Sequence, residues 1–183
     1  MKIPNILTIG RILIAPILII VFYFPGELSD WLCCGIFVLA SFTDYLDGFF
    51  ARLYKQQSKF GELLDPIADK VLVATALALL IMAQTIKDIH VVAAIIIITR
   101  EILISGLREF LAKAQIYIPV TNLSKGKTII QMIAISILLA GNSGDKFLFN
   151  YGIQLGIYLL WMAAILTIWT GYAYLRIGID LID

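Results

Sequence analysis

Four aspartates at fixed spacing are the residues of this chain whose chemistry is most specific. Asp44 and Asp47 lie three residues apart, and Asp65 and Asp69 lie four apart. These spacings place each pair on one helix face. Two carboxylates about 4 Å apart repel by about 4 kcal/mol at an effective dielectric near 20, so four converging carboxylates require cations. An all-oxygen donor set suits Mg²⁺ or Mn²⁺, and four carboxylates can bridge two such ions to clamp phosphate oxygens during displacement at phosphorus.

The rest of the chain predicts a membrane environment around these acids. Hydrophobic residues make up 61% of the 183 residues, whereas soluble domains contain roughly 45–50%. Lipid offers no partner for a free backbone amide, so the hydrophobic runs must be helices. We expect one all-α integral membrane domain over residues 1–183, with a short interfacial helix at residues 2–5 and then six transmembrane helices. The six runs are 6–24, 31–54, 62–84, 89–113, 123–140 and 150–175.

The basic residues predict the orientation of these spans. With a cytoplasmic N-terminus, 12 of the 14 Lys and Arg residues fall on the cytoplasmic side and 2, Lys87 and Lys146, on the outer side. The positive-inside rule therefore places both termini and the four aspartates at the cytoplasmic face of the plasma membrane. The net charge of +1 gives no indication of nucleic-acid binding. The 12 residues are Lys2, Arg11, Arg52, Lys55, Lys59, Lys70, Arg100, Arg108, Lys113, Lys125, Lys127 and Arg176.

Small residues accompany the aspartates. Gly48, Ala51 and Gly61 leave room for a flat ligand against the backbone, but a single small residue in a membrane helix more often serves close helix packing. Gly152 and Gly156 form a small-x3-small pattern that predicts a helix contact in the last span.

The complete aspartate pattern resembles a known family signature. The residues Asp44-x2-Asp47-Gly48-x2-Ala51-Arg52-x8-Gly61-x3-Asp65-x3-Asp69 resemble the motif of the CDP-alcohol phosphotransferases, with no position missing. The resemblance implies a six-helix membrane fold and a homodimer. It also implies two divalent cations, Mg²⁺ or Mn²⁺, held by the four aspartates, with Asp69 as general base. A carboxylate that binds a divalent cation is a poorer base, whereas closeness to the attacking hydroxyl favours this second role of Asp69. By the same resemblance Gly48, Ala51, Arg52 and Gly61 line the nucleotide and diphosphate pocket.

Three further blocks resemble the bacterial phosphatidylglycerophosphate synthases within that family. They are residues 3–11, 99–109 and 124–132. The resemblance implies transfer of the phosphatidyl group from CDP-diacylglycerol to sn-glycerol 3-phosphate, with CMP as the second product. Other transferases that use CDP-diacylglycerol, such as a cardiolipin synthase or a phosphatidylinositol phosphate synthase, are the alternatives within the family.

Basic residues near the ends of spans four and five are candidates for binding the acceptor's phosphate. Arginine can hold a phosphate dianion through two hydrogen bonds. Glu101 and Glu109 are expected to orient the arginines. Ordinary positive-inside charges are the alternative explanation. The four candidates are Arg100, Arg108, Lys125 and Lys127.

A divalent-cation transporter is the alternative from a different functional class, because intramembrane carboxylates can also line an ion path. Such a path must continue to the far side of the membrane. The outer halves of the predicted spans carry almost no polar residues, which favours an enzyme.

Overall fold

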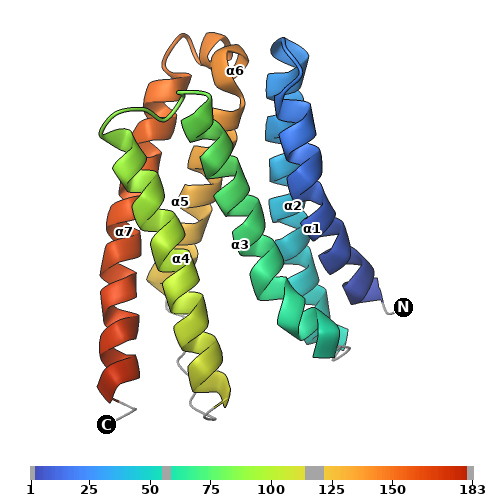
Figure 1. Ribbon diagram of the computed structural model, residues 1–183, viewed down its shortest axis with the longest axis vertical. Coiled ribbons are helices and arrows are strands. Elements are labelled where there is room, and N and C mark those ends of the chain that lie inside the picture. Colours follow the sequence, from blue (N-terminus) through green and yellow to red (C-terminus); the bar gives the residue numbers. More distant parts are fainter. Residues whose placement is uncertain (1–2, 55–58, 114–121, 181–183) are drawn as a thin grey trace.

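The computed structural model describes residues 3–54, 59–113 and 122–180, and side chains at 10, 12–43, 67–111 and 123–176. All regular structure in these ranges is helical (Figure 1). The seven helices are α1 (Ile3–Phe22), α2 (Glu27–Tyr54), α3 (Lys59–Met82), α4 (His90–Lys113), α5 (Asn122–Leu139), α6 (Gly141–Phe147) and α7 (Gly152–Asp180).

Each of the six predicted hydrophobic runs corresponds to one long helix, and the all-α prediction is confirmed. The prediction of a separate short helix at residues 2–5 is wrong for the part that the structure describes, because α1 runs without a break from Ile3. Pro4 lies in the first turn, where no intrahelical partner for its nitrogen is needed.

The short helix α6 was not predicted from the sequence. Helix α5 ends at Leu139, and Gly141, the first residue of α6, has a φ of 52°, a left-handed conformation that glycine adopts readily. The chain then turns by 99° into α6. Asp30 of α2 holds this turn: its carboxylate accepts hydrogen bonds from the Ser143 hydroxyl at 2.7 Å and the Ser143 backbone N–H at 3.3 Å. Tertiary contacts therefore stabilise a helix in a segment whose composition predicts a loop.

Two of the described helical segments are long and apolar enough to cross a membrane. They are His90–Leu111 and Gly152–Arg176. Leu123–Leu139 together with the bent segment Gly141–Phe147 gives a third if the pair is one broken span. These segments are compatible with an integral membrane protein.

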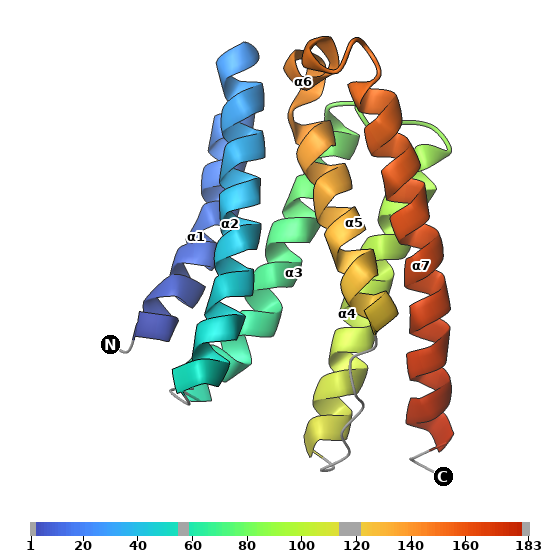
Figure 2. The same cartoon turned by 180° about the vertical axis from the view of Figure 1, so that it is seen from behind.

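The long helices run up and down between two ends of the molecule. In both views α1 begins and α7 ends at the same end, where α2 and α4 also end, while α6 lies at the other end (Figures 1 and 2). Helices α1, α2 and α3 form one group, and α4, α5 and α7 form a second (Figure 2). The two groups meet where α5 packs on α2 and where α3 packs on α4 and α5. Toward the end that carries both termini their ribbons diverge.

The core lies where the two groups meet and is built from aliphatic and small residues. Leu18, Phe37, Leu77, Ile97 and Leu160 are fully buried, and they come from five different helices. Small buried residues, including several alanines of α3, α4, α5 and α7, let the helices approach closely. This packed middle section fixes where each helix presents its polar residues.

The predicted glycine contact in the last helix is confirmed. A Cβ added at Gly156 would lie 2.7 Å from Cγ and Cδ2 of Leu138 on α5, and one at Gly152 would lie 3.0 Å from the Cα of Asp145. Leu138 is 1% exposed, so it has no free space into which to move. The absence of a side chain at Gly156 therefore sets the spacing between α5 and α7.

We expect Gly156→Ala to lower the thermal unfolding midpoint in detergent micelles. Overpacking of this kind costs about 1–3 kcal/mol, more than the gain of about 1 kcal/mol from replacing a helical glycine with alanine. Gly35→Ala is the matched control, since a Cβ there meets nothing within 4 Å. A Gly156→Ala protein as stable as the Gly35→Ala protein would show that α5 and α7 are not in close contact.

Candidate active site

The four aspartates of the motif lie on the two helices that flank the α2–α3 connection. Asp44 and Asp47 are in the second half of α2, and Asp65 and Asp69 are in the first half of α3. The side chains of the first three lie outside the described side chains, as do those of Ala51 and Arg52. Asp69 is described and half-buried.

The backbone arrangement is the one the spacing predicts. Helices α2 and α3 contact one another and bring both aspartate pairs to the end of the molecule that carries the termini (Figures 1 and 2). Among the described side chains no three His, Cys, Asp or Glu residues come together as a metal site. Three of the four predicted ligands are not among them, so the metal site stays a prediction. Gly48 and Gly61 lie on the same two helices, and their contacts also lie outside the described residues.

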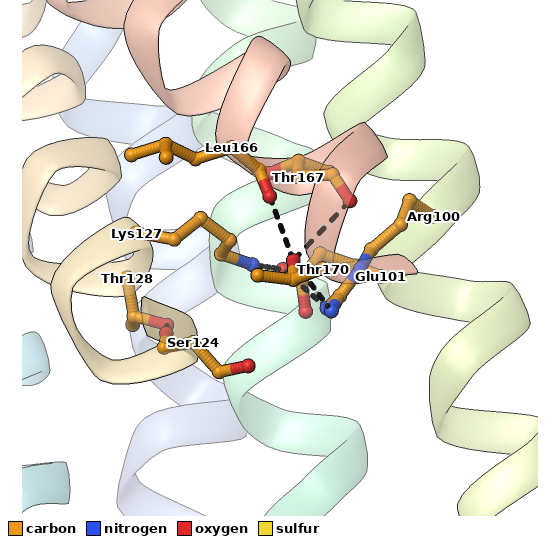
Figure 3. A network of polar contacts seen from close by, with 8 residues as sticks. All are labelled: Arg100, Glu101, Ser124, Lys127, Thr128, Leu166, Thr167 and Thr170. Carbon is orange, nitrogen blue, oxygen red and sulfur yellow. Dashed lines mark hydrogen bonds and ion pairs between the residues drawn. The ribbon is translucent and has the colours of Figure 1, made fainter. Parts of the chain in front are cut away.

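Asp69 links the acidic motif to the basic residues of the second helix group. Its charge acts on Lys127 of α5, more weakly than the charge of Glu101 does. The Lys127 side chain is 3% exposed, and its Nζ donates a hydrogen bond to Oε1 of Glu101 on α4 (Figure 3). A buried ammonium is costly unless it is paired, so Glu101 is what allows Lys127 to stay charged inside the bundle.

Arg100 of α4 belongs to the same network, because it also lies close to Glu101. Its Nη1 lies 3.8 Å from Oε1 of Glu101. Its Nη2 donates a hydrogen bond to Oγ1 of Thr170 on α7 at 3.2 Å (Figure 3). The guanidinium carbon lies 5.9 Å from the centre of the Tyr174 ring, within the range of a cation–π contact. Three helices, α4, α5 and α7, thus supply one polar cluster in an otherwise apolar interior.

Three buried polar atoms of this region have no hydrogen-bond partner among the described residues. They are Nε of Arg100, Oε1 of Gln131 and Oγ1 of Thr167. Gln131 lies one turn beyond Lys127 on α5, and Thr167 lies one turn before Thr170 on α7. Buried polar groups are nearly always paired, so a cluster of free ones indicates that a polar ligand or water completes the site.

The four residues predicted to bind phosphate have different environments. Arg100 and Lys127 are inside the bundle, whereas Arg108 and Lys125 are exposed. The positive charge of Arg100 is close enough to those of Arg108 and Lys127 to interact with each of them. Lys125 lies two residues from Lys127 on α5 and therefore points away from it. Glu101, expected to orient the arginines, has Lys127 as its closer partner.

The sequence analysis did not identify Thr170, Gly171 and Tyr174. All three lie on α7 and contact Arg100. Threonine and tyrosine are common in apolar helices, where a threonine hydroxyl can bond to its own backbone, so residue type alone gives little signal. The only indication in the sequence was their spacing: Tyr174 lies four residues after Thr170 and three after Gly171, which places it on the same helix face as both.

Comparison with known proteins agrees with the aspartate pattern. A model of the CDP-alcohol phosphatidyltransferase family matches residues 1–169. The CDP-diacylglycerol–glycerol-3-phosphate 3-phosphatidyltransferase of Rickettsia bellii is 44% identical over 175 residues, which cover 96% of this chain and 94% of that protein. The Haemophilus influenzae protein of the same name is 44% identical over 179 residues, 97% of this chain and 93% of that protein. The cardiolipin synthase (CMP-forming) of Oryza sativa is 39% identical over 187 residues, 96% of this chain and 57% of that protein. The chain therefore belongs to the CDP-alcohol phosphatidyltransferase family.

Proposed function

We propose that this protein transfers the phosphatidyl group of CDP-diacylglycerol to sn-glycerol 3-phosphate, giving phosphatidylglycerol phosphate and CMP. The observation that carries the proposal is the near full-length likeness, at 44% identity, to two proteins named for this reaction. The acidic motif, linked through Asp69 to a buried cationic cluster, supports it. One helix group supplies groups for the nucleotide lipid, and the other supplies groups for an anionic acceptor.

The proposed enzyme crosses the plasma membrane six times, with both termini and the active site on the cytoplasmic side. The charge asymmetry of 12 to 2 supports this orientation. The arrangement of the helices supports it too. Helix α1 begins and α7 ends at the end of the molecule opposite α6, and Lys146, which is predicted to lie on the outer side, belongs to α6 (Figure 1). By family resemblance the protein acts as a homodimer.

Two divalent cations, Mg²⁺ or Mn²⁺, fit the donor set that the motif offers. Asp44, Asp47, Asp65 and Asp69 provide only carboxylate oxygens, which these hard cations prefer. When bound, the ions neutralise the diphosphate and the charge that develops on departing CMP. Their ligands belong to α2 and α3, which contact each other.

The protein's own residues have three further roles in the proposed reaction. Gly48, Ala51, Arg52 and Gly61 accommodate the nucleotide and diphosphate. Asp69 accepts the proton as the glycerol hydroxyl attacks the phosphorus that carries the lipid. Arg100, Arg108, Lys125 and Lys127 bind the acceptor's phosphate. Arg100 supports this assignment most directly, because its buried Nε is a free donor among the described residues. Catalysis of this type depends mainly on positioning and on charge stabilisation.

Release of labelled CMP from CDP-diacylglycerol by the purified protein tests the proposal. We expect CMP release that requires both Mg²⁺ and sn-glycerol 3-phosphate, with phosphatidylglycerol phosphate as the lipid product. The likeness to a cardiolipin synthase makes phosphatidylglycerol the necessary competing acceptor. CMP release with phosphatidylglycerol but not with glycerol 3-phosphate would replace the proposed function by that of a cardiolipin synthase. Cation transport into liposomes without CMP release would support the transporter alternative.

A further inference from the structure

The side chain of Arg100 lies against one face of α7. Oγ1 of Thr170 lies 3.2 Å from Nη2 of Arg100, and the centre of the Tyr174 ring lies 5.9 Å from the guanidinium carbon. Gly171 lies between them, and a Cβ added there would approach Cγ of Arg100 at 3.2 Å and Nε at 3.4 Å. The hydroxyl of Thr170, the space left by the missing side chain of Gly171 and the ring of Tyr174 thus follow one another along α7 and contact successive parts of the arginine side chain.

The Thr170 hydroxyl has a fixed orientation, which makes it a directional acceptor. It donates to the backbone oxygen of Leu166 at 2.8 Å, with a longer contact to that of Thr167 at 3.3 Å (Figure 3). A hydroxyl has one hydrogen to donate. Because the hydroxyl hydrogen is donated to the preceding turn of α7, Oγ1 can only accept a hydrogen bond from Nη2 of Arg100, through a lone pair. The bond therefore fixes the guanidinium relative to the backbone of α7.

Burial makes this arrangement effective. The Thr170 and Tyr174 residues are 3% and 4% exposed, and the Arg100 side chain is 15% exposed. A free arginine side chain samples many rotamers, and ordering it on ligand binding costs entropy. Contacts that order it beforehand reduce that cost. The guanidinium still has donors to offer, since its buried Nε has no partner among the described residues.

We infer that Thr170, with Gly171 and Tyr174, positions Arg100 for the phosphate of the acceptor. This inference rests on the proposed function, because it takes glycerol 3-phosphate as the ligand of Arg100. The three residues lie just beyond residue 169, where the match to the family model ends. They are positioning residues, since they act through Arg100 and not on the substrate.

Thr170→Val tests the inference, because valine keeps the shape of threonine and removes the acceptor. We expect the KM for glycerol 3-phosphate to rise roughly tenfold, as for loss of a hydrogen bond to a charged group. The KM for CDP-diacylglycerol and kcat at saturating acceptor should stay within about twofold of wild type. Thr170→Ser should restore the acceptor KM, since serine retains the hydroxyl.

Ser136→Ala is the control. Ser136 lies on α5, and its hydroxyl, like that of Thr170, donates to the backbone oxygen four residues earlier, here that of Met132 at 2.8 Å. We expect no change in either KM, because Ser136 is not part of the proposed phosphate site. Gly171→Ala is a second variant that leaves the Thr170 hydroxyl in place, and it should also raise the acceptor KM by displacing the stem of Arg100.

The outcomes separate this inference from the proposed function. Wild-type protein that releases no CMP with glycerol 3-phosphate overturns the proposed function, and the inference falls with it. If wild type is active and Arg100→Lys raises the acceptor KM while Thr170→Val and Gly171→Ala leave it unchanged, the inference alone is overturned. Equal rises in both KM values, or a rise in Ser136→Ala as large as in Thr170→Val, would indicate a general structural effect and also overturn it.

Discussion

Asp65→Asn is expected to abolish CMP release while leaving the protein folded. The substitution keeps the size of the side chain and removes one negative charge from the proposed cation site. Loss of a single group that stabilises transition-state charge commonly reduces rates by roughly 10²–10³, and the loss of a proposed cation ligand should cost at least that much. The measurement is CMP release at saturating substrates across a Mn²⁺ titration, with the thermal unfolding midpoint recorded in parallel.

Asp88→Asn is the matched control for this variant. Asp88 is exposed in the connection between α3 and α4, away from the acidic motif, and has a φ of 51°. Asparagine tolerates that left-handed conformation well, so neither stability nor activity should change. Normal activity of the Asp65→Asn protein would remove the proposed metal role, and an unfolded protein would assign Asp65 a structural role instead.

The helices could be predicted from the sequence because hydrophobic run length and turn residues are local signals. Pro25-Gly26 predicted the first turn, and Gly26 has a φ of 115°. Residues 84–90 predicted another, and Gln84 and Asp88 there have positive φ. The helix α6 was missed because its stability comes from two distant residues of α2. Asp30 accepts a hydrogen bond from Ser143, and Trp31 packs edge-on against Phe147 with ring centres 6.1 Å apart.

The candidate site was predictable only in part. Spacing alone places each aspartate pair on one helix face, because the helical period is fixed. Which residues of different helices meet depends on how each helix is rotated in the bundle, and no local pattern gives that rotation. The sequence therefore could not show that Lys127 turns inward to Glu101 and Asp69. Nor could it show that Arg100 rests on Thr170 of α7.

Glu101→Ala is expected to be the most destabilising single substitution in the described polar cluster. It removes the carboxylate that accepts a hydrogen bond from Lys127, whose side chain is 3% exposed. Breaking a buried ion pair from one side typically costs about 3–5 kcal/mol, because the remaining charge is left uncompensated. Thermal unfolding in detergent micelles measures the effect.

An exposed pair in the same protein provides the control for that measurement. Glu27 accepts a hydrogen bond from Lys146 at 2.6 Å, and both side chains are 69% exposed. Solvent screens such a pair, so Glu27→Ala should change the unfolding midpoint little. If Glu101→Ala were as mild as Glu27→Ala, Lys127 would not depend on Glu101 and would be accessible to solvent or to another counter-charge.

The double variant Glu101→Ala/Lys127→Met separates the structural from the functional role of this pair. Methionine fills the space of the lysine stem without a charge, so much of the lost stability should return, as when buried ion pairs are replaced by apolar side chains. Activity should not return with it, because the proposed phosphate site then lacks one of its cations. A stable double variant with an unchanged KM for glycerol 3-phosphate would make Lys127 a purely structural residue. A raised KM in a stable protein would mean that Glu101 holds a buried lysine in place for the acceptor and that the bundle gives up stability for that role.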